Sequence, residues 1–147
     1  MYLLRVALNS IGLREFKEAL FPLLWKDPAI FYLISRVGVA FFGALTALPI
    51  YLITKEFVRK RYALLSALVF LIIPFHVEHS QKALVDVPLV FLLALVVFYS
   101  IRIAKYGLLK NYILAGIFLG LATSTKYNGL LLVVNILIAH TIYVGKG

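Results

Sequence analysis

Cysteine is absent from this chain of 147 residues, and acidic residues are scarce. Without cysteine, the sequence offers no disulfide, no thiolate metal site and no dithiol redox pair. Only 6 residues are Asp or Glu against 15 Lys or Arg, which leaves a net charge of +9. A nucleic-acid-binding domain needs a soluble face on which such positive charge gathers, and the sequence shows none. We therefore expect no nucleic-acid partner and look for another reason for the basic excess.

Charged residues of both signs are also few, at 14%, whereas 63% of the residues are hydrophobic. A soluble domain carries about 25% charged residues. A chain of this length leaves much of its surface exposed when it folds, so its own core cannot hide so much apolar area. The mean hydropathy of +1.00 indicates that lipid is the solvent. We predict an integral membrane protein of the all-α class, with several transmembrane helices.

The first 28 residues differ from the rest, because apolar and charged residues alternate along them. Leu13, Phe16, Leu20 and Leu24 recur at helical spacing, which predicts an amphipathic helix at the membrane interface. The opening residues contain no continuous apolar run of the kind found in a signal peptide. We expect residues 1–28 to form an external juxtamembrane segment.

Five apolar segments follow, and we predict that each forms a membrane helix. They lie near residues 29–54, 62–75, 83–101, 112–125 and 129–144. As helices, the first would be about 39 Å long, enough for a tilted crossing, and the second only about 21 Å. The sequence TSTKYNG, residues 123–129, separates the last two, and its Asn-Gly pair is a strong turn signal. Two short helices that meet at a turn are therefore expected; one long kinked helix is the alternative.

The basic residues between these segments predict an orientation. Segments 55–61 and 102–111 carry seven basic residues, whereas 76–86 and 123–128 carry two. Lysine and arginine are enriched in cytoplasmic loops. We expect the first two segments to be cytoplasmic and the HVEH segment, 76–86, to be external. The membrane expected is the plasma membrane of a prokaryote.

Three stretches, in this order and spacing, resemble a known family. "LISRVGVAFFGALTALPIYLITKEF" has an Arg early in a long span that ends in a basic loop. "RYALLSALVFLIIPFHVEHSQKALVDVPLVFLLAL" has a helix closed by Pro, a polar loop and an Asp before the next helix. "LAGIFLGLATSTKYNGLLLV" has a G-x-x-x-G-L-A run followed by Thr-Lys. From about residue 28 to 144 the chain resembles the integral-membrane glycosyltransferases of the C superfamily, in particular the protein O-mannosyltransferases and the lipid A aminoarabinose transferases.

This resemblance implies a transferase that takes a sugar from a polyprenyl phosphate and acts on the extracytoplasmic side. The acceptor would be a glycan, a lipid or a protein. The resemblance also implies a catalytic acidic residue in a first external loop, after a first membrane helix. Residues 1–28 hold no Asp-Asp or Asp-Glu pair. We therefore expect the chain to correspond to the N-proximal part of such an enzyme and to lack that residue.

Asp86 is the candidate catalytic residue. Glycosyl transfer from a lipid phosphate needs a base for the acceptor, and cations or a metal for the phosphate. Asp86 lies at the external mouth of the third predicted span, where a carboxylate could orient the acceptor or a metal. The alternative is a helix N-cap, because an Asp with Pro88 close behind it opens a helix well.

A divalent metal is the one candidate cofactor, and its candidate ligands are His76, Glu78 and His79. They form an H-x-E-H pattern, and on a helix two histidines three residues apart share a face. A metal could lie between them with the carboxylate. Such sites need further ligands and supporting partners. The alternative is a polar loop at the membrane interface without metal.

Four residues are candidates for binding the substrate: Arg36, Lys82, Lys126 and Tyr127. Arg36 lies inside the first span, where a cation costs about 2.5 kcal/mol or more on insertion scales, so it should face a polar cavity or a carboxylate. The resemblance makes it a candidate for structuring the active-site loop or contacting phosphate; the alternative is snorkelling to the interface. Lys126, with the polar side chains of 123–128, could hold a phosphate at a helix break. The alternative there is a solvated turn.

Small residues at a spacing of four predict close helix packing, at Gly116 and Gly120 and again at Gly43 and Ala47. For the function, a membrane transporter or a lipid-binding membrane module is the alternative to the transferase, and a structural fragment without activity is a third option. Paired broken helices would favour transport. The sequence shows one broken pair, within 112–144, and no counterpart.

Overall fold

The structure, a computed structural model, describes residues 28–146. These residues are helical apart from short connections, and no strand occurs among them. The predicted all-α class is therefore confirmed. The amphipathic helix predicted near the N-terminus falls within residues 1–27 and lies outside the described part. The chain divides into two units, Met1–Ser35 and Arg36–Gly147, and the contacts considered below all lie within the second.

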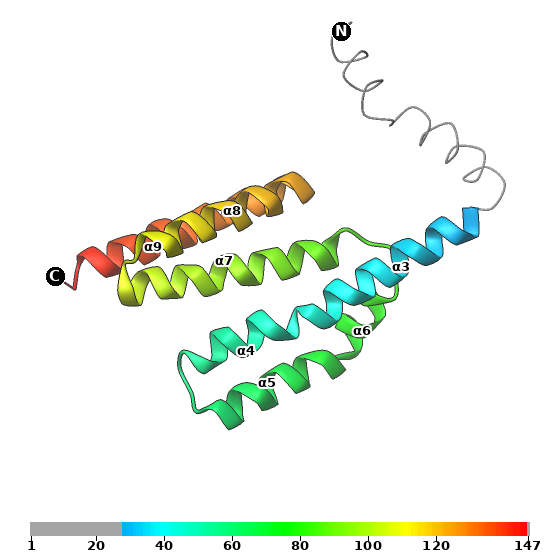
Figure 1. The fold of residues 1–147 in the computed structure, drawn as a ribbon, viewed down its shortest axis with the longest axis horizontal. Coiled ribbons are helices and arrows are strands. Elements are labelled where there is room, and N and C mark those ends of the chain that lie inside the picture. Colours follow the sequence, from blue (N-terminus) through cyan, green and yellow to red (C-terminus); the bar gives the residue numbers. More distant parts are fainter. Residues whose placement is uncertain (1–27, 147) are drawn as a thin grey trace, which may run out of the picture. The chain divides into compact units, whose positions relative to one another are not determined.

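Seven α-helices and one 3-10 helix make up residues 28–146 (Figure 1). They are α3 (Pro28–Leu45), α4 (Ala47–Lys55), α5 (Lys60–Ile72), α6 (Pro74–Ser80), α7 (Asp86–Tyr106), α8 (Leu109–Thr125), the 3-10 helix η1 (Tyr127–Leu132) and α9 (Val133–Val144). Each of the five predicted apolar segments falls on a helix or on a pair of consecutive helices.

The first apolar segment is interrupted once, at Thr46 between α3 and α4. Pro49 lies three residues further on and has no N–H to donate to the carbonyl of Leu45, so the regular helical bonding cannot continue there. The Thr46 hydroxyl is fully buried and donates to the Phe42 carbonyl at 2.8 Å. Despite the interruption, Ala29–Lys55 remains a single apolar stretch of 27 residues, long enough to cross a membrane.

A sharp bend of 60° separates α5 from α6. The cause is Pro74, because a residue before proline is driven out of the helical conformation. Ile73 is accordingly extended, with φ −61° and ψ 120°, and Pro74 then starts α6. The predicted end of the helix at Pro74 is confirmed. The prediction of a loop directly after it is not, since Pro74–Ser80 is helical.

Helix α7 lies between the other helices and forms the centre of the packing (Figure 1). It contacts α8 and α9, and it also contacts α4. Ile103 of α7 packs with Ala115 of α8 and Ala139 of α9, and all three side chains are buried. Alanine has almost no side chain, so it lets two helix backbones approach closely. The helix ends at Gly107, whose φ of 60° is the left-handed conformation that glycine adopts without strain.

The predicted break after α8 is confirmed. Lys126 is extended (φ −155°, ψ 131°), and the chain continues through η1 into α9. Gly129 is buried against α8, where an added Cβ would lie 2.7 Å from the carbonyl carbon of Ala122. Only glycine fits there, which explains why the Asn-Gly pair marks this turn. Two helical segments therefore replace the single kinked helix considered as the alternative.

Three helical stretches of the described residues are long and apolar enough to span a membrane: Ala29–Lys55, Asp86–Tyr106 and Tyr127–Val144. The bent pair α5 and α6 makes a fourth if it counts as one broken span. Helix α8 has 17 residues, which corresponds to about 26 Å against a hydrocarbon core of about 30 Å. The polytopic membrane class is confirmed, while five complete crossings stay a prediction.

The glycines predicted to pack helices closely behave differently from one another. Gly43 is buried in α3, where an added Cβ would overlap the side chain of Ser80 in α6. Gly116 and Gly120 of α8 are exposed, and an added Cβ at either would meet nothing within 4 Å among the described residues. Close packing is therefore confirmed at Gly43 but not at the G-x-x-x-G pattern.

Candidate functional site

The polar residues of the unit Arg36–Gly147 gather at its two ends. At one end, which we call the basic end, Lys105 of α7 forms an ion pair of 2.9 Å with Glu56 after α4, and the Lys146 amine donates to the Ala104 carbonyl at 3.0 Å. At the other end, the start of α7 lies beside the end of α8 (Figure 1), and α6, which packs against α3, precedes α7 in the chain. This second end, which we call the HVEH end, contains the site residues predicted from the sequence.

An ion pair between Asp86 and Lys126 joins two helices at the HVEH end. The Lys126 Nζ lies 2.8 Å from Asp86 Oδ1, although the residues are 40 positions apart in the chain. Asp86 is the first residue of α7, and Lys126 caps the C-terminus of α8. Because α7 and α8 pack as antiparallel neighbours, the start of one lies beside the end of the other. Both side chains are about half exposed, at 48% for Asp86 and 40% for Lys126, so a substrate can reach them.

The alternative role of Asp86 as an N-cap is wrong. The N-cap residue of α7 is Val85, and no side chain makes a capping hydrogen bond there. The Asp86 carboxylate lies in the first turn, where the helix dipole favours a negative charge. Its oxygen accepts from Lys126 instead of from the helix's own N–H groups.

The charge on Lys126 is reinforced by this contact. The hydrogen bond to the Asp86 carboxylate, followed by the attraction between the two charges, raises the pKa of the Lys126 amine above its ordinary value. Lys126 is therefore protonated at neutral pH and presents a cation beside a carboxylate.

The hydroxyl groups near Lys126 do not take part in the predicted phosphate site. Thr123, Ser124 and Thr125 each donate to the main-chain carbonyl four residues earlier in α8, at 2.8 to 3.0 Å. This is the usual satisfaction of Ser and Thr side chains inside helices. Tyr127, at the start of η1, is 80% exposed. Lys126 is therefore the one charged donor that the helix break adds to this end.

Arg36 holds the chain segment that follows α6. Its Nε donates to the main-chain carbonyl of Gln81 at 2.6 Å, across 45 residues of sequence. A guanidinium bound to a carbonyl fixes the loop between α6 and α7, and this loop leads directly to Asp86. The partner of this bond is thus a main-chain oxygen, where the sequence had suggested a polar cavity or a carboxylate.

The three residues of the H-x-E-H pattern have separate partners. His76 donates from Nε2 to the Gly43 carbonyl at 3.0 Å, and His79 donates from Nδ1 to the Phe75 carbonyl at 2.9 Å. Glu78 forms an ion pair of 2.6 Å with Lys82, one turn further along. Within residues 28–146, no group of three His, Asp or Glu side chains is placed to hold a metal ion. The arrangement gives no support to a metal at His76, Glu78 and His79, and it leaves Lys82 paired with Glu78.

Two features of this end were not found from the sequence. The carbonyl of Gln81 holds Arg36, and a main-chain acceptor leaves no signal in the residue type. Ser80 faces Gly43, and its buried hydroxyl has no hydrogen-bond partner among the described residues. The sequence signal for this contact was Gly43, because a glycine at helix-packing spacing predicts that another helix approaches α3 closely.

Comparisons with known proteins identify the family of the chain. The family described as dolichyl-phosphate-mannose-protein mannosyltransferase matches residues 24–144. Dolichyl-phosphate-mannose–protein mannosyltransferase 1 of Saccharomyces cerevisiae is 33% identical over 105 residues, which make up 67% of this chain and 13% of that protein. The chain thus spans about an eighth of the length of this relative. No solved structure matches the chain. The family match covers most of the sequence, and the chain therefore belongs to the dolichyl-phosphate-mannose-protein mannosyltransferase family.

Proposed function

We propose that the chain forms part of a membrane mannosyltransferase that transfers a sugar from a polyprenyl phosphate to a protein on the extracytoplasmic side. The name of the yeast relative supports the donor and the acceptor class. The observation that carries the proposal is the Asp86–Lys126 pair, which sets a carboxylate and a cation side by side at the HVEH end.

These two groups match the needs of the reaction. In the transfer, the acceptor oxygen forms a bond to the anomeric carbon while the bond from that carbon to the phosphate oxygen breaks. The acceptor proton has to leave, and we assign Asp86 as the carboxylate that accepts it. The polyprenyl phosphate departs as an anion, and the Lys126 ammonium stabilises the charge that develops on it. The pair would open as substrates bind, since each partner then has a new ligand.

The remaining candidates have supporting roles in this proposal. Arg36 is a positioning residue, because its bond to the Gln81 carbonyl holds the loop that ends at Asp86. Tyr127 is exposed next to Lys126 and is available to contact the donor. Lys82 adds positive charge at the same end, although Glu78 balances it. A metal has no role in this proposal.

The orientation is part of the proposal. The segments rich in lysine and arginine lie together at the basic end, and such residues are enriched on the cytoplasmic side of membrane proteins. The HVEH end then faces the extracytoplasmic side. The plasma membrane of a prokaryote stays a prediction. The bent pair of α5 and α6 is a second broken helix, a feature named above as favouring transport, but the family of the chain favours the transferase.

The test measures sugar transfer from polyprenyl-phosphate-mannose to an acceptor polypeptide, in membranes that contain the enzyme of which the chain is proposed to form part. Asp86→Asn removes the base and should lower the rate by a factor of about 100 or more. Lys126→Met should weaken binding of the donor, followed in parallel with a photoreactive donor analogue on the purified chain. The control is Glu56→Gln combined with Lys105→Met, which removes the ion pair of the opposite end and should leave both quantities unchanged. If Asp86→Asn and Lys126→Met behave like this control, the assignment of the site is wrong.

A further inference from the structure

The basic end holds more positive charge than its acidic residues balance. Glu56 is the single acidic residue among its described members, and Lys105 already binds both its carboxylate and its main-chain carbonyl. The basic residues of this end are Lys55, Arg59, Lys60, Arg61, Arg102, Lys105, Lys110 and Lys146. An orientation signal alone requires positive charge in the loops, but it requires no particular arrangement of it.

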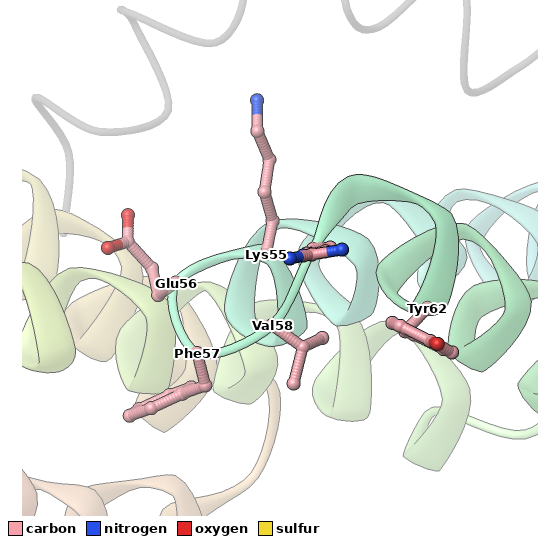
Figure 2. A pocket seen from close by; sticks show the side chains of 6 residues that line it. Lys55, Glu56, Phe57, Val58 and Tyr62 are labelled. Carbon is pink, nitrogen blue, oxygen red and sulfur yellow. The ribbon is translucent and has the colours of Figure 1, made fainter.

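The arrangement is nevertheless particular, because a hollow opens in the connection between α4 and α5. It is a shallow depression that is widely open to the outside. Its lining residues are Lys55, Glu56, Phe57, Val58, Arg59 and Tyr62. Figure 2 shows the side chains of Lys55 and Glu56 on one side of this connection and those of Phe57 and Val58 on the other. The lining is therefore charged on one side and apolar on the other.

The aromatic members of the lining are exposed. Phe57 is 67% and Tyr62 63% exposed, and the Lys105 amine lies 5.0 Å from the centre of the Phe57 ring. Exposed aromatic rings beside cations are typical of the level at which lipid headgroups meet hydrocarbon. The position agrees with this, since the apolar helix α4 ends at the hollow and the apolar helix α5 begins there.

The cations at the start of α5 are not balanced by an acidic residue in the first turn of that helix. Arg59 is its N-cap residue, Lys60 its first residue, and its first turn contains no acidic residue. The dipole of a helix disfavours cations at this terminus. These cations therefore gain nothing from the helix that carries them, and an anion supplied from outside would offset their repulsion.

We propose that this hollow binds the phosphate of an anionic glycerophospholipid from the leaflet at the basic end. Arg59 and Lys55 bind the phosphate oxygens, as cations beside membrane helices bind anionic headgroups. The Tyr62 hydroxyl lies at the glycerol level, and Phe57 and Val58 contact the upper acyl chain. This lipid is distinct from the proposed sugar donor. The hollow and Asp86 lie at opposite ends of the unit, separated by α7, whose 21 residues span about 30 Å.

The test uses the purified chain in a neutral detergent and measures its affinity for phosphatidylglycerol and for phosphatidylcholine by native mass spectrometry. The variant is Lys55→Gln with Arg59→Gln, which removes both phosphate ligands. The matched control is Lys60→Gln with Arg61→Gln, which removes the same charge from adjacent exposed residues that do not line the hollow. The affinity of the variant for phosphatidylglycerol should fall at least about tenfold below that of the control. Phosphatidylcholine should bind weakly to all three proteins.

Equal losses in the variant and the control would overturn the proposal, because diffuse attraction to the whole basic end would then explain the binding. Inorganic phosphate is added as a competitor; if it displaces the lipid at millimolar concentration, the site is a simple phosphate site and not a lipid site. A photoreactive phosphatidylglycerol on the unaltered chain gives a second measurement in case the variant does not fold. Cross-links should concentrate in residues 55–62, and cross-links elsewhere would contradict the assignment.

Discussion

Asp86 and Lys126, the residues to which we assign the chemistry, are half-exposed and should contribute little to stability. Their side chains form an ion pair at 2.8 Å, but both remain accessible to solvent. Exposed ion pairs contribute little to folding, since solvent screens the attraction and ordering the side chains costs entropy. A strong effect on activity with a weak effect on stability is therefore the expected signature of this pair.

The first prediction at the residue scale concerns stability. Asp86→Asn and Lys126→Met should each leave the melting temperature of the purified chain close to that of the unaltered protein, because neither side chain is buried. Differential scanning fluorimetry in detergent measures this. A large drop in the melting temperature would mean that the pair is structural, and a loss of transfer in these variants would then have a different explanation.

The second prediction concerns pH. The contact with Asp86 raises the pKa of Lys126 above that of an unpaired lysine, which is about 10.4. The contribution of the ion pair to stability is thus fully present below that value, because Lys126 is then protonated. It is lost as the pH rises through the raised pKa of Lys126. Donor binding should accordingly persist at pH 9 and decline only at a pH above about 10.5. The affinity for the donor analogue, measured from pH 7 to 11, checks this, with Lys126→Met as the reference that should not show the decline. A decline already complete by pH 9 would contradict it.

At the scale of elements, the contact between α3 and α6 determines where the HVEH segment lies. His76 binds the Gly43 carbonyl, and Ser80 occupies the space that a side chain at position 43 would fill. Both contacts of α6 with α3, through His76 and through Ser80, therefore require glycine at position 43. The bend at Pro74 directs α6 towards this contact, and Arg36 holds the chain that follows.

Gly43→Ala should separate α6 from α3, because the added methyl group overlaps the Ser80 side chain. The expected cost is about 1 to 3 kcal/mol of unfolding free energy, the range for an overpacked contact. The control is Gly38→Ala on the same helix, where the added carbon meets nothing within 4 Å among the described residues. That change should be neutral or stabilising by up to about 1 kcal/mol. Denaturation in a mild detergent measures both, and equal effects in the two variants would show that α6 does not pack as described.

At the scale of the whole molecule, the excess of positive charge lies at the end of the helices opposite the candidate site. Lys105 lies near the end of α7, and Asp86 is its first residue. The ion pair of Lys105 with Glu56 joins segments 55–61 and 102–111 at the basic end. The ion pair of Asp86 with Lys126 joins segments 76–86 and 123–128 at the HVEH end. The two segments of each pair were predicted to share a side of the membrane. If the chain crosses the bilayer, these two ends face opposite compartments.

The absence of cysteine makes this orientation directly testable. Single cysteines are introduced as Tyr127→Cys at the HVEH end and Lys110→Cys at the basic end, both at exposed positions. A membrane-impermeant maleimide added to intact cells should label the first and should label the second only after the cells are opened. Labelling of both from the same side would contradict a crossing between them, and the reverse pattern would place the candidate site in the cytoplasm.

The sequence by itself determined the class of the protein and two of its helix breaks, whereas the interruption at Thr46 was not predicted. High hydropathy leaves lipid as the only suitable solvent, and proline and glycine interrupt helices for local steric reasons that need no tertiary context. The end of α5 before Pro74 and the break at Lys126 were predicted for this reason. The family could also be predicted from the sequence, because the three stretches that resemble it are local and follow one another in a fixed order.

Only the tertiary structure decided the partners of the candidate residues. Lys126 was a candidate from the sequence, but its pairing with Asp86 requires α7 and α8 to pack as neighbours across 40 residues. His76 and His79 share a short helix, yet each turns to a nearby main-chain carbonyl, which no residue pattern encodes. Local sterics act along the chain and can be read from it, whereas the partner of a polar side chain depends on which helices the packing of small residues such as Ala115 and Ala139 brings together.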